Sequence, residues 1–219
     1  SSMVACKDAD AMVTGNIRHY AASVEKLKHV CDARKGEPIF GMTMIVFKGR
    51  TILVADTNVT DFPSSEKLIE IAKSCVRVSR LFGFDPKVAF LSHSTFGKPI
   101  SRNTKHVREA IEKLKREKVD FDFDGEMQPD VALNPLYKDI YPFSKIVGSA
   151  NILIMPALHS AAISTKLMKS FGGAKLIGPL LIGLDQPIEV APLRSSTSDI
   201  LNLASIAAYS SDVIDYKKN

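Results

Sequence analysis

Hydroxyl, glycine and lysine residues are concentrated in one short segment, residues 92–99 (Ser-His-Ser-Thr-Phe-Gly-Lys-Pro). It follows an apolar run, residues 88–91, that is typical of a buried strand, and it precedes a basic amphipathic stretch typical of a helix. Ligands of open α/β sheets bind at such strand ends, and the start of a helix can hold phosphate. An ordinary strand-to-helix connection is an equal alternative, because the segment is neither a P-loop nor a GxGxxG fingerprint. The candidate ligand-binding residues are Ser92, Ser94, Thr95, Gly97 and Lys98.

Two other groups of polar residues have the types but not the spacing for chemistry. Carboxylates alternate at Asp124, Glu126 and Asp130, but no histidine or further acid completes a coordination sphere, so a polar turn is favoured and no metal site is expected. His93 lies between two serines without a GxSxG elbow or an acid partner placed by sequence, so a hydrolase triad is not expected. His159 is interpreted as a polar cap or interface residue.

The composition is that of an ordinary globular protein, with 45% hydrophobic and 24% charged residues in 219. This length suffices for one large or two small domains. No apolar run reaches the roughly 20 residues of a membrane helix, and no secretory leader is visible. The three cysteines, Cys6, Cys31 and Cys75, form no ligand pattern, and their odd number argues for a reducing compartment. We therefore expect a cytoplasmic protein without a membrane partner.

The charge balance is mildly basic, at +5 from 29 Lys and Arg against 24 Asp and Glu. Much of the excess lies in residues 98–118 and in the pair Lys217-Lys218. A solvated helix face explains the first cluster better than a binding patch does. Without tryptophan and with few aromatic residues nearby, a nucleic-acid platform is not expected, whereas a small anionic ligand is compatible with the charge.

The elements that must position these residues alternate between short apolar runs and longer amphipathic stretches, which is typical of parallel α/β architecture. We predict strands over residues 11–14, 40–47, 51–55, 88–91, 119–123 and 152–154, and extended or irregular segments over 177–183 and 188–190. We predict helices over residues 16–30, 66–82, about 107–114, 158–171 and 197–212. The second and third strands form a hairpin around Lys48-Gly49-Arg50, and Gly172-Gly173 ends the fourth helix.

Five motifs follow one another along nearly the whole chain: residues 9–15 (Ala-Asp-Ala-Met-Val-Thr-Gly), 88–95 (Val-Ala-Phe-Leu-Ser-His-Ser-Thr), 123–128 (Phe-Asp-Gly-Glu-Met-Gln), 150–156 (Ala-Asn-Ile-Leu-Ile-Met-Pro) and 177–181 (Ile-Gly-Pro-Leu-Leu). In this order they resemble the phosphate acetyltransferase (phosphotransacetylase) family. The resemblance implies a two-domain α-β-α sandwich of the isocitrate/isopropylmalate dehydrogenase-like type, with a cleft for coenzyme A and acetyl phosphate. It also implies that the first domain is truncated, comprising residues 1–84 plus 193–219, and that residues 85–192 form the second domain.

Several residues depart from the family's pattern at the reacting positions. The resemblance places Pro192, Leu193 and Arg194 where the family has Ser-Arg-Gly, and Glu25 where it has an arginine that faces phosphate. A carboxylate there would repel acetyl phosphate. Asp199 keeps the family's aspartate, and a gap of one residue would bring Arg194 into register. Arg194 and Asp199 are therefore the candidate catalytic residues of one alternative, an active phosphate acetyltransferase.

The other alternative follows from segments that are similar to the C-terminal domain of hybrid bacterial NADP-dependent malic enzymes, namely residues 155–165 and 183–188. The family's Pro-Asp-Leu and downstream Asn are here Pro156-Ala157-Leu158 and Ala162. This resemblance implies a regulatory domain that senses acetyl-CoA or CoA and helps to assemble a homo-oligomer, at least a dimer. Its partner would be an N-terminal malic-enzyme domain, which would hold NADP and a divalent metal. We expect no cofactor in this chain, since it has no GxGxxG.

Overall fold

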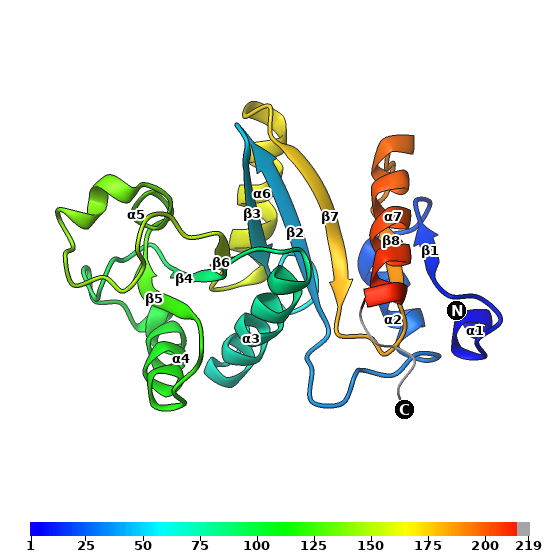
Figure 1. The fold of residues 1–219 in the computed structure, drawn as a ribbon, viewed down its shortest axis with the longest axis horizontal. Helices are drawn as coiled ribbons and strands as arrows, with labels where there is room; N and C mark the ends of the chain where they lie inside the picture. Colours follow the sequence, from blue (N-terminus) through cyan, green and yellow to red (C-terminus); the bar gives the residue numbers. More distant parts are fainter. Residues whose placement is uncertain (214–219) are drawn as a thin grey trace.

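The computed structural model describes residues 1–213 as two β-sheets with helices packed around them (Figure 1). The strands are β1 (Met12–Gly15), β2 (Phe40–Phe47), β3 (Arg50–Ala55), β4 (Lys87–Leu91), β5 (Asp122–Met127), β6 (Ile152–Ile154), β7 (Lys175–Ile182) and β8 (Ile188–Ala191). The helices are α1 (Ser2–Ala5), α2 (Tyr20–Leu27), α3 (Ser65–Leu81), α4 (Lys105–Arg116), α5 (Pro129–Leu133), α6 (Leu158–Phe171) and α7 (Thr197–Val213), with 3-10 turns at Arg102–Thr104 and Pro135–Lys138. The basic pair Lys217-Lys218 lies outside the described residues. Among those residues, no helix has both the length and the apolar character needed to cross a bilayer.

The larger sheet has six strands in the order β5-β4-β6-β3-β2-β7. Its strands β3, β4, β5 and β6 pair in parallel, whereas β2 runs antiparallel to both β3 and β7. The predicted hairpin is confirmed, but its turn contains two residues, because Arg50 already pairs with Phe47. Lys48 and Gly49 both have positive φ, at 48° and 75°, as a type I′ turn requires.

Helices cover both faces of this sheet, so the predicted α/β class and its α-β-α layering are confirmed. On one face, α3 and α4 bury residues at helical spacing against the strands, including Leu68 and Ile71 of α3 and Leu114 of α4. On the other face, α5 and α6 contribute Ala132 and Ala161 to a second core. The carboxyl ends of β4 and β6 therefore emerge between two helical layers, where loops can present side chains.

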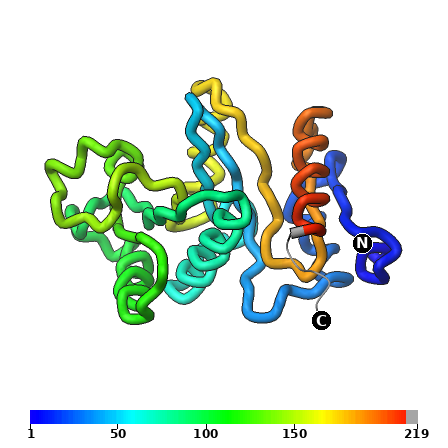
Figure 2. Tube along the Cα trace, viewed as in Figure 1, coloured from blue at the N-terminus to red at the C-terminus, as the bar shows by residue number. Residues whose placement is uncertain are grey.

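The smaller sheet pairs a strand near the start of the described chain with a strand near its end. Strand β1 pairs in parallel with β8, and Figure 2 shows the first residues and α7 at the same end of the molecule. The buried carboxylate of Glu189, on β8, accepts a hydrogen bond of 2.9 Å from the backbone N–H of Leu181, on β7, and so links the two sheets. Strands β2 and β3 hydrogen-bond within the larger sheet, and the division into two domains at residues 84 and 192 stays a prediction.

Two predicted elements have different bounds in the structure. The helix predicted over residues 16–30 is shorter, Tyr20–Leu27, because Gly15 and Asn16 have φ of 106° and 69° and turn the chain before it. The strand predicted over residues 119–123 instead spans Asp122–Met127, so Asp124 and Glu126 lie within β5, whereas Asp130 lies in α5. The glycine stop after α6 is confirmed, with Gly172 as the C-cap and Gly173 at a φ of 61°.

Candidate functional site

The loop after β4 is the first candidate site, and the structure turns most of its hydroxyl groups inward. Ser92, Ser94 and Thr95 are all buried. The Ser92 and Ser94 hydroxyl oxygens lie 3.1 Å apart, and Thr95 Oγ1 accepts a hydrogen bond of 3.2 Å from the backbone N–H of Gln128. These groups brace the loop against β5. The predicted phosphate-binding role of the inward hydroxyl groups stays a prediction.

The carboxylate of Glu126 holds this loop in place through hydrogen bonds. Its carboxylate oxygen accepts hydrogen bonds from the Ser94 hydroxyl at 2.9 Å and from the Gly97 backbone N–H at 3.1 Å. The Arg108 guanidinium, on α4, lies 3.4 Å from the same oxygen. The Glu126 side chain is 1% exposed, so one buried carboxylate connects β5, α4 and the loop. This role of Glu126 does not follow from local sequence pattern, because Glu126 and the loop are 28 or more residues apart.

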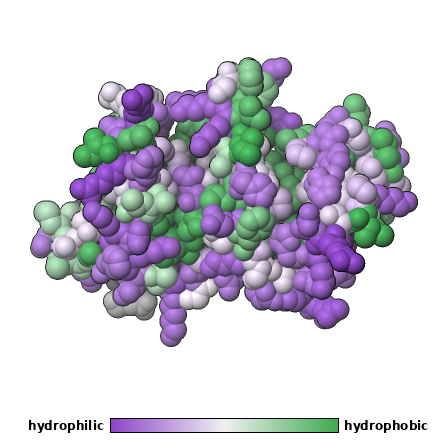
Figure 3. Space-filling model, turned by 180° about the vertical axis from the view of Figure 1, so that it is seen from behind, coloured by the Kyte–Doolittle hydropathy of each residue, from purple (hydrophilic) through white to green (hydrophobic). Residues whose placement is uncertain are grey.

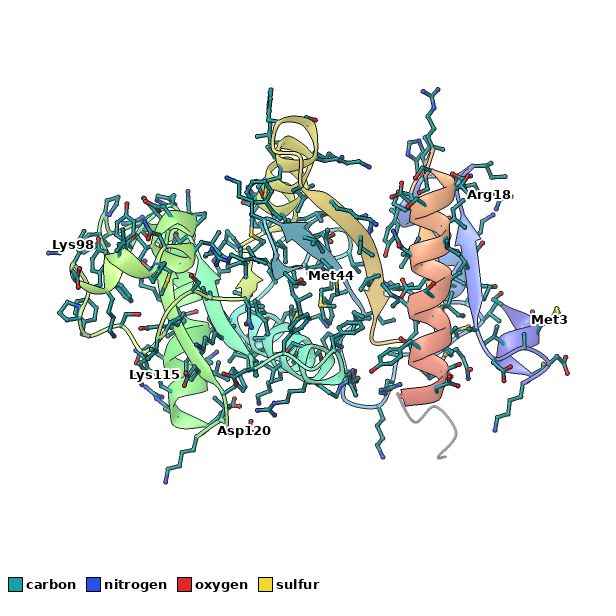
Figure 4. All side chains as sticks on the ribbon, turned by 45° about the horizontal axis from the view of Figure 1, so that its top comes forward. Met3, Arg18, Met44, Lys98, Lys115 and Asp120 are labelled. Atoms are coloured by element: carbon teal, nitrogen blue, oxygen red, sulfur yellow. The ribbon has the colours of Figure 1, made fainter. Side chains whose placement is uncertain are left out.

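The exposed residues of the loop are His93, Lys98 and Pro99. The backbone N–H groups of Thr95 and Lys98 each donate to the other residue's carbonyl oxygen at 3.0 Å, which closes a tight turn. Lys98 lies at the tip, at one end of the long axis of the molecule (Figure 4). Of the predicted ligand-binding residues, Lys98 is the one whose charged group is open to solvent.

The acidic motif on β5 is occupied by internal hydrogen bonds. Asp124 accepts from its neighbour Gly125 at 2.9 Å and from the backbone N–H of Lys145 at 2.7 Å. Within residues 1–213, no group of three or more His, Cys, Asp or Glu side chains is arranged to hold a metal ion. These carboxylates therefore hold the neighbouring backbone in place by accepting hydrogen bonds.

The second candidate site consists of the predicted catalytic residues Arg194, in the connection from β8 to α7, and Asp199, in the first turn of α7. Arg194 has a φ of 61°, and its backbone N–H donates to the Asn16 carbonyl oxygen at 3.2 Å. Gly15 precedes Asn16, and a Cβ added to it would lie 2.3 Å from the carbonyl oxygen of Ala191, so only glycine fits there. The ends of β1 and β8 are thus tied side by side.

Asp199 serves as part of the cap of α7. Its carboxylate accepts from the Ser196 backbone N–H at 3.0 Å, and its own N–H donates to the Ser196 hydroxyl at 3.2 Å, a reciprocal capping arrangement. Partial burial acts to raise the pKa of Asp199, but these hydrogen bonds, together with the charges of Lys169 and Lys175, bring that pKa below its ordinary value. Asp199 is therefore an anion near two lysines from α6 and β7.

The residues that replace the family's reacting groups lie on the surface. Leu193 is half exposed, and Glu25 is exposed on α2. Figure 4 shows Arg18, three residues after Gly15, at the opposite end of the long axis from Lys98. The structure therefore does not bring the Ser92–Lys98 loop together with Arg194 and Asp199 within one chain.

A cavity that the sequence did not reveal adjoins the exposed side of the first loop. Its volume is about 350 Å³, and three imidazoles line it, those of His93, His106 and His159. Ser92 is the one predicted ligand-binding residue among its lining residues. The three histidines come from segments up to 66 residues apart, so only the fold brings them together.

Three comparisons relate this geometry to known proteins. A family model, "Phosphate acetyl/butaryl transferase", matches residues 1–208. The chain is 47% identical over 209 residues to an NADP-dependent malic enzyme of Rhizobium meliloti, covering 95% of this chain and 28% of that protein. It is 31% identical to a phosphate acetyltransferase of Bacillus subtilis, covering 91% and 62%. A solved phosphotransacetylase structure from Streptococcus pyogenes superposes with a TM-score of 0.88 at 32% identity, covering 96% of this chain and 65% of that chain.

Proposed function

Because the chain belongs to the phosphate acetyl/butaryl transferase family, we propose that it is a regulatory and assembly domain of an NADP-dependent malic enzyme. The observation that supports this most is the match to such an enzyme over 95% of this chain, which spans only 28% of the relative's length. In the proposed parent, an N-terminal malic-enzyme domain binds NADP and a divalent metal and oxidatively decarboxylates malate. The dehydrogenase-like type of the two-domain sandwich and a cytoplasmic location belong to the same proposal.

The transferase site of this domain is degenerate. Leu193 offers no charge to a transferring acetyl phosphate, and Glu25 offers the wrong sign. Removing one stabiliser of developing charge commonly lowers turnover by roughly 10²–10³. Of the candidate catalytic residues, Asp199 accepts a hydrogen bond in the cap of α7 through its carboxylate. Arg194 donates its backbone N–H to the Asn16 carbonyl oxygen.

The ligand of the regulatory domain is a CoA ester, acetyl-CoA or CoA, bound at the loop of residues 92–98. Lys98 supplies an exposed cation in the loop that follows the carboxyl end of β4, and ligands of open α/β folds bind at this edge of the sheet. Regulation requires that the ligand bind two assembly states with different affinities.

Isothermal titration of the chain with acetyl-CoA tests this role. Saturable heat is expected, and Lys98→Ala should weaken binding about two- to fivefold, since an exposed ion pair contributes about 0.2–1 kcal/mol. Lys35→Ala, which removes an exposed lysine elsewhere, is the matched control. If millimolar acetyl-CoA gives neither heat nor a thermal shift, with this chain and with its full-length parent, the sensing role is wrong.

The second candidate function is an active phosphate acetyltransferase, which transfers acetyl between acetyl phosphate and CoA. The family match and the likeness to the Streptococcus pyogenes phosphotransacetylase favour it. In this alternative Arg194 and Asp199 orient the substrates. Turnover in a thiol-release assay separates the two functions.

Assembly into at least a dimer belongs to the first function. Helix α6 buries only Ala161 and Thr165, whereas four large apolar side chains on it are exposed to varying degrees: Ile163, Leu167, Met168 and Phe171. Seen from behind, the molecule has a strip of hydrophobic residues at its upper centre, over α6 (Figure 3). A second copy of the chain that packs on this strip would remove it from water.

A further inference from the structure

The cavity lined by His93, His106 and His159, named here the histidine pocket, has the features of a small-ligand site. It measures about 350 Å³, within the roughly 300–1,000 Å³ of small-molecule sites. Three segments converge on it: the end of β4, the start of α4 and the turn from β6 into α6. No Asp or Glu side chain is among the described residues that line it.

We propose that the histidine pocket binds a small phosphate ester. The proposal goes beyond CoA binding at the neighbouring loop and holds whether or not that binding occurs, since of the loop residues only Ser92 and His93 line the pocket.

The imidazoles of His93 and His159 are the first donors for such a ligand. Both residues are exposed, and in the part of the chain that the structure describes neither ring makes a hydrogen bond to protein. An imidazole has an N–H to donate in either protonation state. Two donors therefore face the pocket without an internal partner to satisfy them.

His106 forms the half-buried side of the pocket and has a defined tautomer. Its Nε2 lies 3.0 Å from the carbonyl oxygen of Pro156. A carbonyl oxygen only accepts, so Nε2 carries the proton that it donates, and Nδ1 of the neutral ring is left as an acceptor for an O–H group of a ligand. This bond also ties the start of α4 to the segment before α6, which holds the pocket's two helical walls together.

Helix α6 begins without a side-chain cap, because its N-cap is Ala157, which has no polar side-chain atom. At α4 the preceding 3-10 turn binds the first N–H groups, since the Asn103 N–H donates to the Ser101 hydroxyl and the Lys105 N–H donates to the Arg102 carbonyl oxygen. Free N–H groups and the positive end of a helix favour an anion. This adds to the donors of the imidazoles.

The geometry favours a phosphate ester over a carboxylate. Donors from the end of β4 and the start of α6 and the acceptor Nδ1 of His106 approach the pocket from different sides. A monoanionic phosphate ester presents oxygens in several directions and one O–H, whereas a carboxylate presents two oxygens in one plane and no O–H. The organic part of the ester has an apolar wall in Phe62, which is 76% exposed and lies 5.4 Å from His159 between ring centroids. Burial of an exposed phenyl ring under the organic part of a ligand is favourable, because it removes apolar surface from water.

Nuclear magnetic resonance of the imidazole C–H groups tests the proposal directly, because the chain has only five histidines. On titration with phenyl phosphate, the signals of His93, His106 and His159 should shift together and saturate. The signals of His19 and His29, which lie just before and just after α2, should stay in place. Inorganic phosphate should give the same pattern with weaker affinity, since it lacks the ring that packs on Phe62.

Two substitutions and a control identify the donors. His93→Gln and His159→Gln should each weaken phenyl phosphate binding about tenfold, because a hydrogen bond to a charged group contributes about 1.5–3 kcal/mol. Both positions are exposed, so the variants should fold. His29→Gln is the matched control and should leave affinity unchanged. Lys98→Ala should also leave it unchanged, which distinguishes this pocket from the loop site.

Each outcome decides the question. Shifts confined to the three pocket histidines, with weakened binding in the two variants, support the proposal. Absence of saturation at tens of millimolar, equal shifts at all five histidines, or unchanged affinity in both variants overturns it. Comparing CoA with dephospho-CoA, which lacks the 3′-phosphate monoester, then distinguishes the phosphate of CoA from that of a free ester as the source.

Discussion

Arg108 and Glu126 form an ion pair of 3.4 Å between a guanidinium that is about one-third exposed and a carboxylate that is almost completely buried. The same Glu126 oxygen holds Ser94 and Gly97, and Arg108 also donates to the Ser101 carbonyl oxygen at 2.9 Å. The pair therefore fixes both ends of the segment between β4 and α4. It explains how a loop of small and polar residues keeps one conformation.

Replacing Glu126 by alanine should destabilise the chain by about 2–4 kcal/mol, because it leaves the Arg108 charge and two buried donors without their acceptor. Urea denaturation measures the change in unfolding free energy, and hydrogen exchange at the Gly97 amide should accelerate. Glu109→Ala removes an exposed carboxylate on the same helix, paired with Lys105, and should stay within about 0.5 kcal/mol of wild type. An equal effect of both substitutions would contradict this account.

The isolated chain should produce only traces of acetyl-CoA from acetyl phosphate and CoA. In the proposed correspondence Leu193 and Glu25 stand where the family has arginines, and each lost stabiliser costs roughly 10²–10³ in turnover, so activity at least a hundredfold below an active relative is expected. A thiol-release assay checks this, with the Streptococcus pyogenes phosphotransacetylase as positive control. Robust turnover that scales with protein concentration would promote the transferase alternative.

The stability of the chain should fall as pH rises from about 4.5 to 8, in part because of Glu189. Burial raises the pKa of this carboxyl group to about 8, against the lowering effect of the Leu181 N–H. The folded state then keeps a proton that the unfolded state releases above its ordinary pKa. This contribution to the unfolding free energy is complete below about pH 4.5 and is lost progressively as the pH rises to about 8. Burial, and then Glu189 and Asp56, raise the pKa of Tyr20 as well, so Tyr20 stays neutral throughout.

Glu189→Gln should remove this contribution, a few kcal/mol between pH 5 and 8.5, and flatten the pH dependence. The measurement is the unfolding free energy from urea titrations at both pH values, compared between wild type and variant. Glu25→Gln, an exposed change on α2, is the control and should leave the dependence as it is. A Glu189→Gln variant with the wild-type slope would show that the carboxyl group is ionised in the folded state.

The chain should self-associate through the apolar side chains of α6. Leu167→Glu together with Phe171→Ser should shift the mass measured by light scattering at tens of micromolar toward the monomer, since both side chains are at least half exposed. Ile140→Glu, an equally exposed apolar residue on another surface, should leave the mass unchanged. A monomeric wild-type mass at that concentration would count against the assembly role.

The sequence was sufficient to predict most of the longer helices and strands, because apolar spacing and turn residues act locally. The type I′ turn at Lys48-Gly49 and the Ser64 cap of α3, which accepts from the Lys67 N–H at 3.2 Å, are contained within a few residues. The candidate sites depended on partners far away in the chain. Neither the inward turn of Ser94 toward Glu126 nor the meeting of His93 with His159 follows from local pattern, since each needs the order of strands in the sheet.

The pairing of β1 with β8 also has a consequence for how the chain is made. Met12 lies beside Ile188, so the second sheet cannot form until some 175 further residues have left the ribosome. Meanwhile the hairpin of β2 and β3 needs only its own turn and can form early. Strand β1 is thus synthesised well before its partner strand β8, and it depends longest on protection from wrong contacts during synthesis.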